Sequence, residues 1–187
     1  MTTRQAFIAA AAALTTFLSA APQASANAAE RSVSRAHRHD LDAVRAATRD
    51  FRDLAVAVTA GGYSTEVVDL AGIACIADPE STGGMGVHYV NAGLLTDGEI
   101  DALRPEAMIY EPQSEGGSRL VAVKYLVLRT SWEQNHKRAP KLFGQEFELV
   151  PAGNRYGLPD FYELHAWIWR ANLKGTFEDW NPQVSCA

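Results

Sequence analysis

Tyr162-Glu163-Leu164-His165-Ala166-Trp167-Ile168-Trp169 has the aromatic and aliphatic content that is typical of a β-strand. Successive side chains of a strand point to opposite faces. The face expected to pack in a core carries Tyr162, Leu164, Ala166 and Ile168; the other carries Glu163, His165, Trp167 and Trp169. A carboxylate and an imidazole beside two indoles are unusual on a face turned to water, so this second face is expected to line a pocket or an interface.

Further segments rich in β-branched and aromatic residues predict the rest of the sheet. They are residues 87–90, 107–111, 119–128 and 146–150. The long connection over residues 130–144 and the Gly/Pro-rich stretch 151–159 are expected to be loops at the edge of this sheet. Loops of this length inside a compact domain are often functional.

Two helices are expected before most of these strands. Apolar residues recur at steps of three and four over residues 41–60, which predicts an amphipathic helix that ends at Gly61-Gly62. The capping-box pattern Thr96-Asp97-Gly98-Glu99 predicts a helix of about two turns. Helices gathered towards the N-terminus, without regular alternation with strands, predict an α+β domain. Its sheet is expected to be mainly antiparallel, with the N-terminal amphipathic helix packed on it.

The first residues have the profile of an export signal. Arg4 precedes an uncharged apolar run from Ala6 to Leu18, and small residues follow around Ala26. We therefore expect a signal peptide at residues 1–26, a flexible lead-in at 27–40 and one globular domain at 41–187. The run is shorter than the roughly 20 residues of a membrane helix, so no stable membrane insertion is expected. An uncleaved anchor and an ordinary N-terminal helix remain the alternatives.

Export by the general secretory route would make this a periplasmic or secreted protein. Removing residues 1–26 takes away Arg4 alone, so the 17 basic and 22 acidic residues become 16 and 22, a net charge of −6. A mildly acidic chain without a basic stripe is not expected to bind nucleic acid.

Cys75 and Cys186 are the two cysteines of the chain. In an oxidising compartment the expected outcome is a disulfide that closes a loop of about 110 residues. Two free thiols, or a metal site shared by the two cysteines, are the alternatives.

Chemistry is expected from residues on different strands, because the common catalytic motifs are absent. The sequence contains no HExxH, GxSxG, GxxxxGK[ST] or GxGxxG pattern. His88, Glu111 and His165 form a candidate ligand set for a divalent transition metal such as zinc, copper or iron. The residues expected to contact a small ligand beside it are Met85, Tyr110, Glu163, Trp167 and Trp169. The competing interpretation is structural, with both histidines hydrogen-bonded in the interior and Glu111 a surface acid.

Three parts of the chain resemble a group of exported bacterial proteins. They are the GMGxHYVN pattern from Gly84, the tripeptide Tyr110-Glu111-Pro112, and YELHxWxWxxNxxGxFxxWNPxxSC from Tyr162 to Cys186. The resemblance covers most of the chain that follows the expected signal. It implies bacterial origin and export, and it transfers no catalytic role.

Three functions are compatible with these features. The first is a binding protein that holds a metal ion or small ligand against the sheet face bearing His88, Glu111 and His165. The second is a metal-dependent enzyme that uses the same site, with Glu111 or Glu163 as general base. The third is a non-catalytic interaction protein with an exposed Trp-rich face. The sequence leaves the oligomeric state and the choice between binding and catalysis open.

Overall fold

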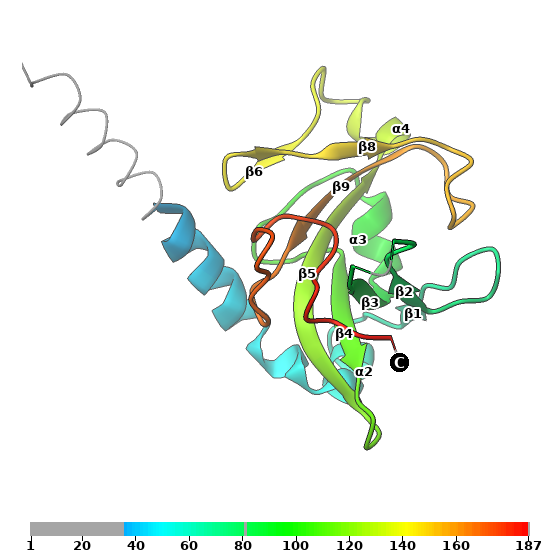
Figure 1. The fold of residues 1–187 in the computed structure, drawn as a ribbon. Helices are drawn as coiled ribbons and strands as arrows, with labels where there is room; N and C mark the ends of the chain where they lie inside the picture. Colours follow the sequence, from blue (N-terminus) through cyan, green and yellow to red (C-terminus); the bar gives the residue numbers. More distant parts are fainter. Residues whose placement is uncertain (1–35, 81, 187) are drawn as a thin grey trace, which may run out of the picture. The chain divides into compact units, whose positions relative to one another are not determined.

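A computed structural model describes residues 36–80 and 82–186. As predicted, the fold is α+β with an antiparallel sheet (Figure 1). Seven strands form the main sheet in the order β1-β3-β4-β5-β9-β8, and β2 also pairs with β3. Their bounds are β1 (Thr65–Glu66), β2 (Cys75–Ala77), β3 (Gly84–Val90), β4 (Ala107–Pro112), β5 (Ser118–Leu128), β8 (Glu148–Val150) and β9 (Phe161–Ala166). A small separate hairpin contains β6 (Lys141–Leu142) and β7 (Gln145–Glu146).

The single helix expected over residues 41–60 is broken into three pieces. A helix covers residues 36–47, followed by the 3₁₀ helix η1 (Arg49–Arg52) and by α2 (Leu54–Thr59). The first break is a turn at Thr48. The second occurs at Asp53, whose backbone is extended and whose carboxylate accepts a hydrogen bond from the Ala55 amide at 2.9 Å. This side-chain cap starts a new helix instead of continuing the old one.

The helix of residues 36–47 packs on the domain as the amphipathic pattern predicts. Val44 is fully buried in the main core cluster. The Arg45 Nε donates a hydrogen bond to the Ile168 carbonyl at 2.8 Å. The expected lead-in at 27–40 is therefore helical from residue 36 onward, and the expected signal peptide lies outside the described residues.

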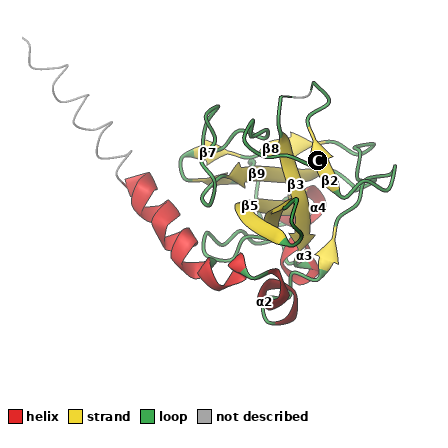
Figure 2. Cartoon of the chain, turned by 60° about the horizontal axis from the view of Figure 1, so that its bottom comes forward, coloured by secondary structure: helices red, strands yellow, loops and turns green. Residues whose placement is uncertain are grey.

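The prediction of a helix that starts at the capping-box pattern of residues 96–99 is wrong, because the helix found here ends at Thr96. It is α3 (Ala92–Thr96), and the Asn91 side-chain oxygen accepts hydrogen bonds from the Gly93 and Leu94 amides at its start. The residues after Thr96 form turns in which aspartate side chains accept bonds from nearby amides. Such local bonds compete with helix continuation. The remaining helix is α4 (Arg129–Trp132), and Figure 2 shows the short helices around the strands.

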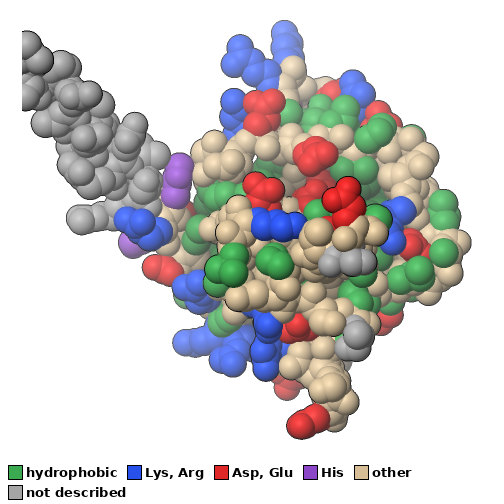
Figure 3. Space-filling view, viewed as in Figure 1, with side chains coloured by type: hydrophobic (Ala, Val, Ile, Leu, Met, Phe, Trp, Pro, Cys, Tyr) green, Lys and Arg blue, Asp and Glu red, His purple; other side chains and the backbone are tan. Residues whose placement is uncertain are grey.

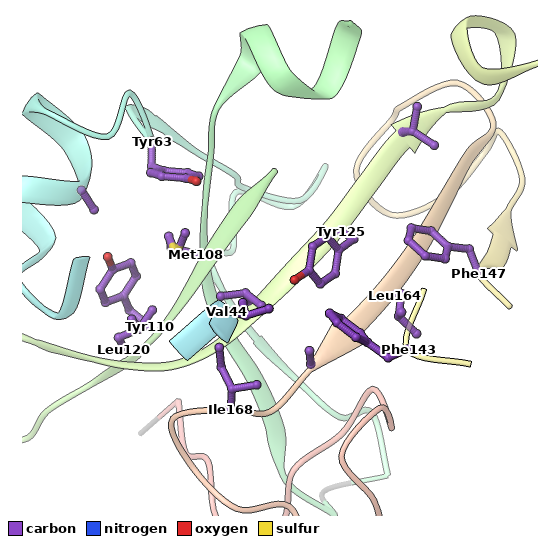
Figure 4. Packing of buried hydrophobic residues seen from close by; sticks show 14 of the residues in the cluster. Val44, Tyr63, Met108, Tyr110, Leu120, Tyr125, Phe143, Phe147, Leu164 and Ile168 are labelled. Carbon is purple, nitrogen blue, oxygen red and sulfur yellow. The ribbon is translucent and has the colours of Figure 1, made fainter. Parts of the chain in front are cut away.

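The main core lies on one face of the sheet. Tyr125 of β5 packs edge-on against Phe143, with ring centres 5.7 Å apart, and also contacts Phe147 from the β6–β8 region. Figure 4 shows these rings together, with Met108 and Tyr110 of β4 further along the same cluster. The predicted core face of β9 is confirmed, since Tyr162, Leu164, Ala166 and Ile168 all belong to this cluster.

The disulfide between Cys75 and Cys186 is present, as predicted, and joins β2 to the C-terminal segment. The same segment forms a bridge between Asn181 and Gly84 at the start of β3. Figure 3 shows acidic, basic and apolar side chains interspersed over the face in view. Within residues 36–80 and 82–186, no helix has the length and apolar character needed to cross a membrane.

Candidate functional site

An apolar cavity with polar groups on one wall lies on the sheet face opposite the main core. Its volume is about 310 Å³, within the size range of small-molecule sites. The buried polar side chains that reach it from the sheet are His88 on β3, Lys124 on β5 and Glu163 on β9. The other lining residues, mostly apolar, are Thr65, Glu66, Val67, Val68, Val90, Ala92, Leu95, Leu126, Tyr156, Leu158 and Phe161.

Small residues on the two central strands make room for these polar groups. Ala107 of β4 lies between Val90 and Lys124 in the sheet register, and Ala122 of β5 lies opposite Ile109. Both alanines are fully buried. Long side chains from β3, β5 and β9 can therefore extend over the middle of the sheet, where alanine methyl groups leave space.

The curvature of the sheet brings His88 and His165 together. Their strands, β3 and β9, are separated by β4 and β5, and three inter-strand steps in a flat sheet would span about 14 Å. The two imidazole ring centres are 5.9 Å apart. The sheet must therefore curve around this face. The register shifts at Ile76/Ala77 and Ile109/Tyr110 contribute to this curvature, because such irregularities bend strands.

Lys124 and Glu163 form a buried ion pair at the polar wall. The Lys124 Nζ is 2.7 Å from the Glu163 Oε2, and the two side chains are only 3% and 8% exposed. A charge buried without its partner would cost several kcal/mol. Each residue therefore neutralises the other, and the pair presents little net charge to a molecule in the cavity.

His165 is held by a carboxylate from the C-terminal segment. Its Nδ1 lies 3.0 Å from the Asp179 Oδ1, and its ring stacks on Trp167 with 8° between the planes. Burial and then the charge of Lys124 lower the pKa of His165, and the hydrogen bond from His165 lowers the pKa of Asp179. Because a carboxylate only accepts hydrogen bonds, the Nδ1 of His165 carries the proton and its Nε2 has a free lone pair.

His88 is a buried polar side chain whose hydrogen bonding is incomplete. It is 4% exposed, and among the described residues neither ring nitrogen makes a hydrogen bond of good geometry. Burial, followed by the charge of Lys124, holds the pKa of His88 well below its usual value, so the ring is neutral. The backbone of Gly86 interacts with the ring and opposes the lowering of its pKa. The neutral ring therefore offers one donor and one acceptor at the cavity wall. Orphaned buried groups of this kind are rare in native proteins and require an explanation.

Two loops form another part of the cavity wall. Residues 67–74 supply Val67 and Val68, and the loop predicted over 151–159 supplies Tyr156 and Leu158. The Arg155 Nη2 joins the loops through an ion pair with the Asp69 Oδ2 at 2.8 Å. The Leu70 amide also donates a hydrogen bond to the Arg155 carbonyl at 2.9 Å.

The structure brings together two of the three predicted metal ligands, His88 and His165, but not Glu111. The Glu111 carboxylate pairs with the Arg170 Nη1 at 2.9 Å and accepts a hydrogen bond from the Ser185 amide at 3.1 Å. It lies two residues along β4 from Ile109, the register partner of His88. Among the described residues, the carboxylates that gather with His165 are those of Glu163 and Asp179, with ligand atoms within 4.8 Å of one another.

The predicted ligand-binding residues divide in the same way. Glu163 lines the cavity. Trp167 does not, and it stacks on His165, which also lies outside the lining. Met85 does not line the cavity, and Tyr110 belongs to the main core, where its hydroxyl donates to the Phe51 carbonyl at 2.6 Å.

Trp169 also lies on the core side, which corrects the predicted alternation. Strand β9 ends at Ala166, and the Trp169 amide turns to bond with the Val121 carbonyl at 3.1 Å. Its indole packs against the main core and donates to the Thr48 hydroxyl at 3.2 Å. Because Trp167 is also buried, with 4% exposure, the two indoles do not form an exposed aromatic face.

Lys124 and Asp179 are functional candidates that the sequence analysis missed. Lys124 had a visible signal, since it is the one charged residue within the apolar run from Leu120 to Leu128. A charge at such a position requires a buried partner. Asp179 had no comparable signal, because it lies in a loop and reaches His165 only through the path of the C-terminal segment.

Comparison of the chain with protein-family models, with curated proteins and with solved structures produced no match. The function is therefore argued from the geometry of the site itself.

Proposed function

We propose that this protein binds a small, largely apolar molecule that carries one hydroxyl or carbonyl group. The observation that supports this most directly is His88, whose two ring nitrogens are buried at the wall of an apolar cavity and make no hydrogen bond of good geometry with the other described residues. A ligand oxygen at this point would supply the missing hydrogen bond. A buried donor or acceptor that lacks a partner costs about 1–3 kcal/mol, which a suitable ligand recovers.

The charges of the site favour a neutral ligand. Lys124 and Glu163 already neutralise each other at 2.7 Å, and the lowered pKa of His88 keeps its ring uncharged. The remaining carboxylate of the lining, Glu66, is exposed to solvent and accepts a hydrogen bond from the Tyr89 hydroxyl at 2.6 Å. The apolar walls then favour a hydrocarbon body, because burial of apolar area contributes about 25 cal/mol per Å². Specificity would come from the one polar contact to His88, as in other mostly apolar ligand pockets.

We also place this binding activity outside the cytoplasm. The export-signal profile of residues 1–26 supports this location. The Cys75–Cys186 disulfide supports it independently, because structural disulfides form and persist mainly in oxidising compartments. Expression with residues 1–26 intact, followed by fractionation and N-terminal sequencing, tests it; unprocessed protein in the cytoplasm would contradict export.

Binding is tested with the matched probes 2-naphthol and naphthalene, which differ by one hydroxyl group. Isothermal titration calorimetry should show that the chain binds 2-naphthol about tenfold more tightly than naphthalene, since one recovered hydrogen bond is worth roughly 1.4 kcal/mol. In His88→Leu the apolar cavity remains and the polar contact is lost. We therefore expect this variant to bind both probes with similar affinity.

Leu173→Ala is the control, because Leu173 is 79% exposed and lies outside the cavity lining. It should retain the preference of the unmodified chain for 2-naphthol. Equal affinity of the unmodified chain for both probes, an undiminished preference in His88→Leu, or no binding of either probe would each contradict the proposal.

A further inference from the structure

We infer that His88 and His165 supply two nitrogen ligands of a binding site for a divalent transition metal ion such as Zn²⁺. The Glu163 carboxylate lies close to His165 in this site, and Asp179 orients His165. This inference does not rest on the proposed apolar ligand. It concerns the polar cluster behind the cavity wall, including two residues, His165 and Asp179, that do not line the cavity.

His165 has the hydrogen-bonding arrangement of a metal-binding histidine. Asp179 accepts a hydrogen bond from its Nδ1 at 3.0 Å, and its Nε2 is buried without a partner among residues 36–80 and 82–186. Histidines that bind metals usually donate their other ring N–H to a carboxylate or carbonyl, which fixes the tautomer and the ring orientation. Here that contact directs the lone pair to Nε2.

His88 supplies the second nitrogen at a suitable separation. Two imidazoles that bind one zinc ion at about 2.1 Å have ring centres roughly 5 to 6 Å apart. The ring centres of His88 and His165 are 5.9 Å apart and the rings are nearly perpendicular, at 78°. Neither nitrogen of His88 makes a hydrogen bond of good geometry in the described part of the chain, and the Gly86 backbone engages at most one of them, so the ring keeps a nitrogen for a metal.

The carboxylates give the site the charge that a cation requires. A Glu163 oxygen, a His165 nitrogen and an Asp179 oxygen lie within 4.8 Å of one another. His88 lies outside this group and is placed by its ring contact with His165. Two carboxylates against the single ammonium group of Lys124 leave this cluster with a net charge of about −1. Lys124 competes with a metal for Glu163, because its Nζ is 2.7 Å from the Glu163 Oε2. Removing that ammonium should therefore strengthen metal binding.

The test titrates the full-length, untagged chain with Zn²⁺ in competition with a chromophoric chelator. A parallel titration with Co²⁺ records the visible absorption bands of a four-coordinate site. His37 and His39 form a second histidine pair near the N-terminus, so the double variant His37→Ala/His39→Ala is the matched control. We expect one Zn²⁺ per chain with a Kd of about 10 µM or tighter, unchanged in this control.

Variants within the cluster test the assigned roles. His88→Ala and His165→Ala should each weaken Zn²⁺ binding about a hundredfold, since each removes a ligand. Asp179→Asn keeps the shape of the side chain and should weaken binding about tenfold, the usual effect of losing an orienting carboxylate. Lys124→Met should tighten binding about tenfold through the loss of a nearby positive charge. A purely structural cluster would show none of these changes.

The inference is overturned by Zn²⁺ binding weaker than about 10 µM. It is also overturned if binding survives in His88→Ala and His165→Ala, or if it is lost in the His37/His39 control. If the alanine variants do not fold, the inference is tested by Asp179→Asn and by the Co²⁺ spectrum of the unmodified chain. Unchanged Zn²⁺ affinity in Asp179→Asn, or a spectrum without the bands of a four-coordinate site, would then overturn it. Failure of the metal site is distinguishable from failure of the apolar pocket, because the preference for 2-naphthol should persist in Asp179→Asn.

Discussion

Glu106 is a buried acid whose protonation links stability to pH. It is 2% exposed, and its Oε2 accepts a hydrogen bond from the Leu126 amide at 2.8 Å. Burial raises the pKa of Glu106 to about 8 from an ordinary value of 4.5. Between these values the folded chain keeps the proton that the unfolded chain releases. The stability that depends on the protonated form is therefore lost as pH rises through this window, by a few kcal/mol in total.

Glu106→Gln retains an acceptor for the Leu126 amide and removes the ionisation. We expect the variant to become more stable relative to the unmodified chain as the pH is raised from about 5 to about 8. The measurement is the free energy of unfolding in urea, taken as the difference between the two proteins at each pH. The lowered pKa values of the buried residues His88 and His165 make stability rise with pH, which is the opposite dependence. Both proteins share this contribution, so it cancels in the difference. A difference that does not change with pH would contradict the role of Glu106.

Individual residues also show why sequence analysis identified only part of the site. His88, His165 and Glu163 were found because polar side chains interrupt strands that are otherwise apolar. Lys124 carried the same signal and was missed. Glu111 carried a similar signal but pairs with Arg170 and the Ser185 amide. The hydrogen-bond donors to a buried carboxylate can come from residues that are distant in sequence. Strand periodicity therefore does not identify those donors.

At the scale of elements, the two long central strands were predicted well, the short strands β1, β2 and β6 were not predicted, and helix boundaries were predicted poorly. The predicted strands at 107–111 and 119–128 differ from β4 and β5 by one residue. These strands are long apolar runs, and burial favours a strand along their whole length. Helix boundaries depend on individual side-chain caps. Asn91 and Asp53 start α3 and α2 at positions that apolar periodicity does not mark.

Asn91→Ala tests the cap of α3. The Asn91 side chain accepts bonds from the Gly93 and Leu94 amides and donates to the Gly61 carbonyl at 3.1 Å. We expect a loss of about 1–2 kcal/mol in the free energy of unfolding, measured in urea. Asp53→Ala is the matched comparison, since Asp53 makes a single exposed capping bond, and it should cost less. A larger loss in Asp53→Ala would contradict this ranking.

At the scale of the whole molecule, the disulfide fastens the C-terminal segment against the start of the sheet. Cys75 and Cys186 are 111 residues apart in sequence. The segment that ends at Cys186 also delivers Asp179 to His165 and the Ser185 amide to Glu111. The cross-link therefore stabilises the fold and also keeps a site residue in place.

Cys75→Ala/Cys186→Ala should lower the free energy of unfolding by about 4 kcal/mol, because the unfolded chain regains the entropy of a long loop. The measurement is urea unfolding at fixed pH. Dithiothreitol should reduce the stability of the unmodified chain by a similar amount and leave the double variant unaffected. A double variant whose stability lies within about 1 kcal/mol of the unmodified chain would show that contacts of the segment, and not the cross-link, hold it.

The sequence by itself determined the α+β class, the core face of β9, the pairing of the two cysteines and the polar character of the face bearing His88 and His165. The fold class and the two faces of β9 follow from the local periodicity of apolar residues. The disulfide follows because a chain with two cysteines has one possible intramolecular pairing. Only the tertiary structure decided that His88 and His165 meet, that Lys124 pairs with Glu163, and that Asp179, not Glu111, lies beside His165. These contacts depend on the curvature of the sheet and on the path of the C-terminal segment, which arise from packing across the whole domain.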